Sequence, residues 1–128
     1  MGLMKWLAKH NIQGIVKSQV SKYEHMKKTF QGNDTVIIQG LFESRFDRRF
    51  FGARRAEKER IEEYLQREGS PKSLFDLCLA IGEIEFSPVD LQQYFFIHDI
   101  MFAELERLGY KVEPRPTSFE QKSKVLNE

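Results

Sequence analysis

The chain has 128 residues, of which 41% are apolar and 30% are charged. This length fits a single domain, and this composition is ordinary for a globular protein and excludes an intrinsically disordered or low-complexity chain. The single cysteine excludes a disulfide framework and any cluster held by several thiolates. No apolar run approaches the ~18 residues of a membrane span.

Charge is unevenly distributed along the chain, although its net value is only +1. Residues 1–32 contain six lysines and one acidic residue, whereas residues 70–109 contain two basic and seven acidic residues. This segregation predicts either attraction between two parts of the fold or a charged docking surface. Both interpretations stay open at the level of sequence.

Residues 1–30 predict a short arm followed by a longer helix. On a helical wheel the apolar residues of the two parts point about 140° apart, so one straight helix cannot bury both sets in the same direction. We therefore expect an amphipathic arm over residues 1–10, helical over 2–9, a break at His10-Asn11 and a helix from 12 to about 30, with Asn11 as its N-cap. The apolar residues of the arm are Leu3, Met4, Trp6 and Leu7, and those of the longer helix are Ile12, Ile15, Val16, Val20, Tyr23, Met26 and Phe30.

The next two segments also predict helices. Residues 35–46 are ambiguous, because Val36 to Ile38 favour a strand. Helix is favoured because Ile38, Phe42 and Phe46 recur four residues apart. Residues 48–67 have opposite charges four apart, which is typical of a solvated helix, and Gly69 ends this segment.

Two Ser-Pro pairs predict the starts of the following helices. Ser70-Pro71 and Ser87-Pro88 each place a capping hydroxyl before a proline that suits the first helical position. Asp90 adds the spacing of a capping box to the second pair. We expect the first of these helices to end at Gly82.

The second of these helices, over about 88–108, is expected at the centre of the fold. From Tyr94 to Phe102 it is apolar nearly all round, and we expect Phe95 and Leu105 to lie in the core. The sequence thus predicts an all-α, single-domain bundle of five or six helices. Its expected parts are the N-terminal arm (1–10), the helical domain (11–110), and an extended segment with a short C-terminal helix (111–128).

No catalytic or metal-binding arrangement emerges from the motifs. His98-Asp99 resembles part of the site of metal-dependent phosphohydrolases, but adjacent residues on a helix diverge by about 100° and cannot clasp one ion. A hydrogen-bonded core histidine is the favoured interpretation of His98. Cys78 lies on an apolar stripe without a neighbouring base and is interpreted as an inert core thiol. We expect no cofactor and no metal.

An arginine–phenylalanine segment is the first candidate for binding. It spans residues 45–55, and its candidate contacts are Arg45, Arg48, Arg49, Arg54, Arg55 and Phe50. Arginine forks bind phosphates, and aromatic rings stack on unpaired bases. The simpler alternative is that the phenylalanines face the core and the arginines pair with nearby acids. A sequence pI near 7.8 also lacks the basic footprint of most nucleic-acid-binding domains.

The arm is the second candidate. Such a segment docks into the groove of a partner, lies weakly in a membrane interface, or folds back on its own bundle. Its candidate contacts are Leu3, Met4, Lys5, Trp6, Leu7 and Lys9.

The favoured function is a non-catalytic adaptor or assembly subunit that binds another protein or itself through this arm and its segregated charge. The alternatives are a nucleic-acid-binding module and, third, an enzyme centred on His98. We expect a cytoplasmic protein without a targeting segment, with peripheral contact to a membrane as a weaker hypothesis.

Overall fold

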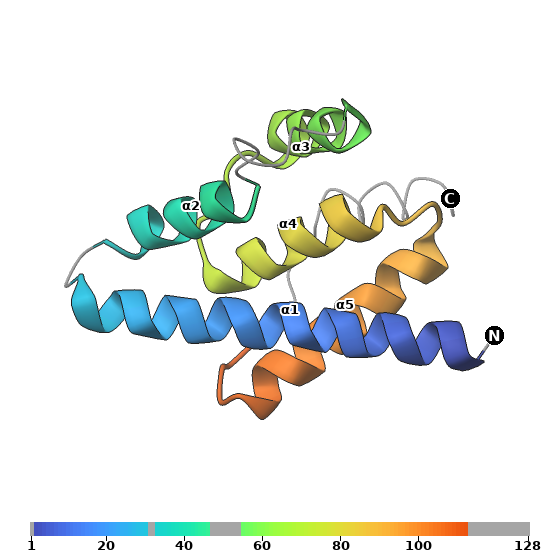
Figure 1. Ribbon diagram of the computed structural model, residues 1–128, viewed down its shortest axis with the longest axis horizontal. Coiled ribbons are helices and arrows are strands. Elements are labelled where there is room, and N and C mark those ends of the chain that lie inside the picture. Colours follow the sequence, from blue (N-terminus) through green and yellow to red (C-terminus); the bar gives the residue numbers. More distant parts are fainter. Residues whose placement is uncertain (1, 31–32, 47–54, 113–128) are drawn as a thin grey trace.

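The computed structural model describes residues 2–30, 33–46 and 55–112. Most of these residues lie in helices, and none of them lies in a strand (Figure 1). The five helices confirm the predicted all-α, single-domain fold. They are α1 (Gly2–Thr29), α2 (Asp34–Arg45), α3 (Arg55–Glu68), α4 (Leu74–Phe86) and α5 (Leu91–Arg107). The ambiguous segment 35–46 is therefore a helix. The expected C-terminal helix lies outside the described residues.

The helices pack around α4, which contacts each of the other four, whereas α1 contacts α2, α4 and α5. Figure 1 shows α4 between α1 and α3, with α5 crossing α1. Eight of the 13 residues of α4 are buried. The helix expected at the centre, α5, packs on α1 and α4 and leaves Phe95 39% exposed. The apolar core is thus centred on α4 and shared with the inner faces of α1 and α5.

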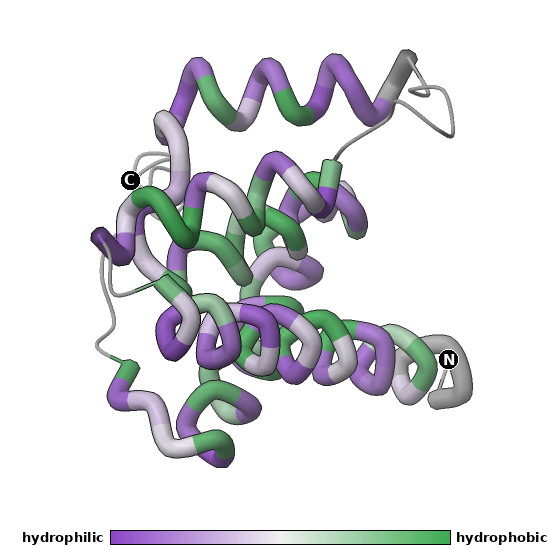
Figure 2. Tube along the Cα trace, turned by 60° about the vertical axis from the view of Figure 1, so that its left-hand side comes forward, coloured by the Kyte–Doolittle hydropathy of each residue, from purple (hydrophilic) through white to green (hydrophobic). Residues whose placement is uncertain are grey.

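The predicted break at His10-Asn11 is wrong, because α1 is one continuous helix of 28 residues. The two sets of apolar residues can belong to one straight helix because only one set has to be buried against the bundle. Ile12 and Val16 are fully buried against the bundle, whereas the N-terminal end of α1 projects beyond the other helices (Figure 2). An asparagine inside a helix costs only a few tenths of a kcal/mol, so continuity is cheaper than a break.

The N-caps of α4 and α5 lie three residues after the predicted ones. The side chain of Ser73 accepts from the backbone N–H of Asp76 at 3.1 Å, and that of Asp90 accepts from Gln93 at 2.8 Å. Each helix therefore begins directly before its apolar stripe, not at the upstream Ser-Pro pair. Ser87 instead ends α4 in a left-handed conformation with φ of 45°, and its N–H donates to the carbonyl of Glu83.

Helix α4 also continues through Gly82, where we expected it to end. A Cβ atom at Gly82 would collide with the terminal methyl of Met101 on α5, and Ile97 Cγ2 would lie 3.2 Å away. Glycine at this position therefore gives room for the close approach of α5 and does not end α4. Its low helix propensity is offset by this packing.

We expect Gly82→Val to lower the free energy of unfolding by about 1–3 kcal/mol, because the added methyl groups overpack the α4–α5 contact. Gly40→Ala is the matched control, since a Cβ atom at Gly40 meets no atom within 4 Å. It should stabilise α2 by about 0.5–1 kcal/mol. Urea denaturation of both variants measures the difference, and equal effects would contradict the close α4–α5 contact.

A polar cluster links α1 to the end of α5. The buried Glu104 carboxylate accepts two hydrogen bonds from Arg107, at 2.6 and 2.8 Å, and lies 3.8 Å from Lys17 Nζ. The hydrogen bonds from Arg107 hold the pKa of Glu104 below its usual value, although burial acts in the opposite direction. The hydroxyl of Tyr110 also donates to Glu24 at 2.8 Å. The basic and acidic parts of the chain thus contact each other here.

Candidate functional site

The N-terminal end of α1 exposes two large apolar side chains. Trp6 is 58% exposed and Leu7 is 46% exposed. The Trp6 ring stacks on the imidazole of His10, with centroids 5.6 Å apart and planes 10° from parallel. The contact joins residues four apart on one helix face and presents the indole as part of a flat aromatic surface.

The structure places residues 2–10 of the predicted arm in α1, and Met1 lies outside the described residues. Leu3, Met4 and Lys5 belong to the first turn of α1, residues 2–5, for which only the backbone is described, and Lys9 is exposed. Trp6 and Leu7 are not buried by their own bundle, so the interpretation that they fold back onto the core does not hold for these two.

A groove lies next to this end, where the N-terminal half of α1 meets the C-terminal ends of α2 and α4. It encloses about 590 Å³. The α1 side is formed by His10, Asn11, Gly14, Ile15 and Ser18, and the opposite side by Arg45, Glu85 and Phe86. The groove does not follow from the sequence, because its two sides are far apart in the chain. The available signal was the pair of small residues, Gly14 and Ser18, in phase with Leu7.

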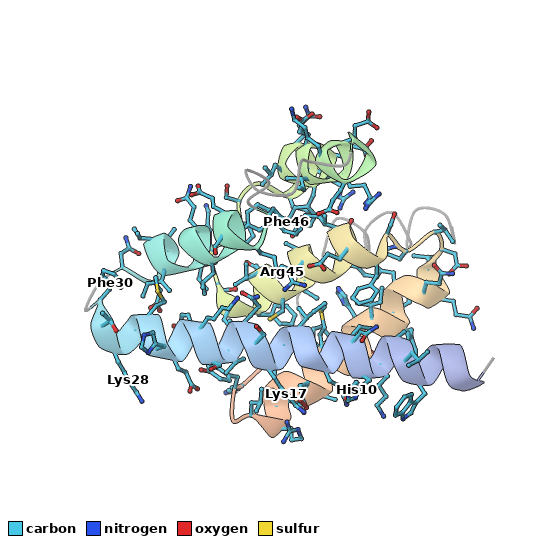
Figure 3. The ribbon with its side chains drawn as sticks, viewed as in Figure 1. His10, Lys17, Lys28, Phe30, Arg45 and Phe46 are labelled. Atoms are coloured by element: carbon cyan, nitrogen blue, oxygen red, sulfur yellow. The ribbon has the colours of Figure 1, made fainter. Side chains whose placement is uncertain are left out.

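One arginine of the arginine–phenylalanine segment forms a wall of this groove. Arg45 donates two hydrogen bonds to Glu85, from Nε at 2.7 Å and from Nη2 at 2.8 Å. Figure 3 shows Arg45 between α2 and α4, and His10 on α1. The Phe46 ring packs edge-on against Phe42, with centroids 5.1 Å apart. At these two positions the simpler interpretation holds: the arginine pairs with an acid, and the ring packs against the core.

The remaining nucleic-acid candidates are not brought together in the described part of the chain. Arg48, Arg49, Phe50 and Arg54 lie outside the described residues. Arg55 is the first residue of α3, for which only the backbone is described.

His98 is a core residue with little access to solvent. Its ring lies between those of Tyr94 and Phe102, at centroid distances of 4.2 and 5.1 Å. Burial lowers its pKa from 6.5 to about 4, so the imidazole is neutral at pH 7. Within the described residues, Nε2 has no hydrogen-bond partner, so the hydrogen bond we expected is absent at that nitrogen. Asp99, the other half of the predicted pair, is exposed.

Cys78 is fully buried in α4, and desolvation raises the pKa of its thiol from 9.0 to about 12. The thiolate needed for nucleophilic or redox chemistry is therefore disfavoured, as expected for a core thiol. Among the residues that the structure describes, no group of three His, Cys, Asp or Glu side chains is placed to hold a metal ion. None of the described helices has the length and apolarity to cross a membrane.

A second hollow, of about 230 Å³, lies between α3, α4 and the start of α5. It is lined in part by Tyr64, Phe75, Tyr94, Glu68, Asp76 and Glu83. Arg67 forms ion pairs with both Glu68 and Glu83 and lies over the Tyr64 ring, 5.6 Å from its centroid. Arg67 thus compensates two of the three carboxylates, and burial raises the pKa of the Tyr64 hydroxyl.

Comparison with protein-family models, with curated proteins and with solved structures gives no match to this chain.

Proposed function

We propose that this chain is a non-catalytic protein-interaction subunit that binds a partner through the N-terminal end of α1. One observation carries the proposal: Trp6 and Leu7, near the N-terminal end of α1, are both large apolar side chains that remain exposed. Tryptophan is among the residues that contribute most to protein interfaces, and contiguous exposed apolar surface is typical of docking sites.

The energetics favour a docking role for this end of the helix. Burying a side chain such as Leu7 contributes about 1.5–3 kcal/mol, and Trp6 offers a larger area, before the cost of association. Because α1 is already helical, little backbone ordering is required when a partner binds. Preorganisation of this kind reduces the cost of binding.

The chemistry of the other candidate residues gives less support to the alternatives. His98 is buried between aromatic rings and Cys78 is buried in the core, so neither reaches a substrate in this conformation. Arg45 is engaged by Glu85 and presents no free guanidinium to a phosphate.

The test compares wild type with the double variant Trp6→Ser/Leu7→Ser, with each protein immobilised and exposed to extract from its source. The variant should lose the proteins that wild type retains, while its helical circular dichroism and melting midpoint stay close to wild type. Val36→Ser is the matched control, because Val36 is also exposed but lies on α2. Retention of the same proteins by the double variant, or its unfolding, would refute the proposal.

A further inference from the structure

Helix α3 lies at the edge of the fold and packs extensively on only one other described helix, α4 (Figure 1). By contrast, α1, α2, α4 and α5 each pack on at least two others. Nine of the 14 residues of α3 are charged. Within the described part of the chain, Tyr64 is its single buried apolar side chain, and Ile61 and Leu65 are partly buried. The core is therefore continuous through the other four helices without α3.

Two arginines of α3 make polar contacts with the C-terminal end of α4. The carbonyl of Ile84 lies in the last turn of α4, where its helical donor would be the backbone N–H of residue 88. Pro88 has no N–H, and Arg60 Nε donates to this carbonyl instead, at 2.8 Å. Arg67 forms an ion pair with Glu83 in the same turn. Both guanidinium groups are also favoured by the negative end of the α4 dipole.

The contact between α3 and α4 is bordered by two hollows. One encloses about 170 Å³ between α3 and the C-terminal end of α4, and the other encloses about 230 Å³ between α3, α4 and the start of α5. Tyr64 lines both hollows. Close packing along the whole helix is thus absent in the described residues, and α3 is held mainly by one buried ring and a few charged contacts.

From this arrangement we propose that α3 is a reversible lid, which detaches from α4 as a unit while α1, α2, α4 and α5 stay folded. Opening breaks few contacts compared with those that hold each of the other helices, which is the property of segments that open locally. It uncovers Ile84 at the end of α4 and widens the hollow between Tyr64 and Tyr94. Because guanidinium groups make the polar contacts, screening by salt favours the open state. The lid is distinct from the exposed end of α1 and does not depend on docking there.

Hydrogen–deuterium exchange of the full chain, resolved by peptide mass spectrometry, measures the opening. After correction for intrinsic rates, the amides of α3 should exchange together, about tenfold or more faster than those in the middle of α1 and α4. Raising sodium chloride from about 0.05 M to about 0.5 M should accelerate exchange in α3 about threefold. Exchange in the middle of α1 should stay the same, because its apolar contacts are not screened.

The double variant Arg60→Gln/Arg67→Gln should loosen the lid, because it removes both guanidinium groups and keeps residues that favour a helix. Exchange in α3 should be about tenfold faster than in wild type. Lys58→Gln is the matched control, since it removes a positive charge from an exposed position of the same helix. It should stay within about twofold of wild type. In both variants α1 and α5 should exchange as in wild type.

Uncovering of α4 is measured by thiol labelling of Ile84→Cys. Wild type gives the background, because its Cys78 is fully buried. The rate of labelling should rise with salt by the same factor as exchange in α3.

Equal exchange in α3 and α1, or a double variant in which all five helices exchange faster together, would show that α3 is an integral part of the core. Exchange in α3 that salt leaves unchanged would show that charged contacts do not hold the lid. Labelling of Ile84→Cys that does not follow exchange in α3 would show that α4 stays covered. Each of these results overturns the inference.

Discussion

Leu105→Ala should lower the free energy of unfolding by about 2–5 kcal/mol, because it removes buried methyl groups from a side chain that is only 1% exposed. Leu105 lies on the face of α5 that packs against the core, so neighbouring side chains have little freedom to collapse into the cavity. Leu77→Ala in α4 should cost a similar amount, since Leu77 is fully buried. Urea denaturation monitored by circular dichroism measures both effects.

Phe95→Ala is the control on the same helix. Because Phe95 is more than one-third exposed, its loss should cost about 1 kcal/mol or less, although phenylalanine is the larger side chain. Comparable costs for Phe95→Ala and Leu105→Ala would show that α5 is rotated about its axis relative to this structure. The pair therefore tests the orientation of the helix as well as the depth of the core.

Hydrophobic periodicity alone does not determine whether Phe95 is buried or which helix lies at the centre of the fold. The run from Tyr94 to Phe102 is apolar nearly all round, and this property predicted a central helix with Phe95 inside. In the fold, α4 takes the position that contacts every other helix, so α5 needs only one buried face. A single sequence does not rank two apolar helices by centrality, because the ranking depends on tertiary packing.

The prediction of helical type was more reliable than the prediction of helix ends. Apolar spacing of four residues correctly favoured helix over strand for 35–46, where Asn33 caps α2 by accepting from Thr35 at 2.9 Å. The predicted helix ends were wrong where several residues suit the same role. Ser70 and Ser73 both suit an N-cap, and Gly82 suits either a terminus or a close helix contact. Which of these two roles Gly82 has depends on the position of Met101 on α5.

The candidate site was predictable in part. The phase of Trp6 and Leu7 relative to the Ile12 face indicated that these residues could not share one buried direction, and both are exposed. The predicted break was unnecessary, since the helix simply extends past the bundle. The groove was not predictable, because Arg45 and Glu85 are 40 residues apart and meet only in the folded chain.

Acidification below neutral pH should destabilise the protein through His98. Burial lowers the pKa of this imidazole from 6.5 to about 4, so between these values the unfolded chain binds a proton that the folded chain does not. Stability is therefore fully present above pH 6.5 and is lost as the pH falls towards 4. At about 1.4 kcal/mol per pKa unit, the loss amounts to about 3 kcal/mol over the whole range and about 2 kcal/mol by pH 5.

His98→Leu isolates this contribution, because it keeps an apolar side chain at the position and removes the titrating group. Between pH 7 and pH 5 its free energy of unfolding should change much less than that of wild type. Above pH 6.5 it should be at least as stable, since Nε2 has no partner to lose among the described residues. Glu104 does not affect this comparison. Because the pKa of its carboxylate is lowered, protonation of Glu104 reduces the free energy of unfolding only at pH values below the ordinary pKa of 4.5. If His98→Leu and wild type lose stability in parallel from pH 7 to pH 5, the imidazole is not held neutral by the core, and another group carries the acid sensitivity.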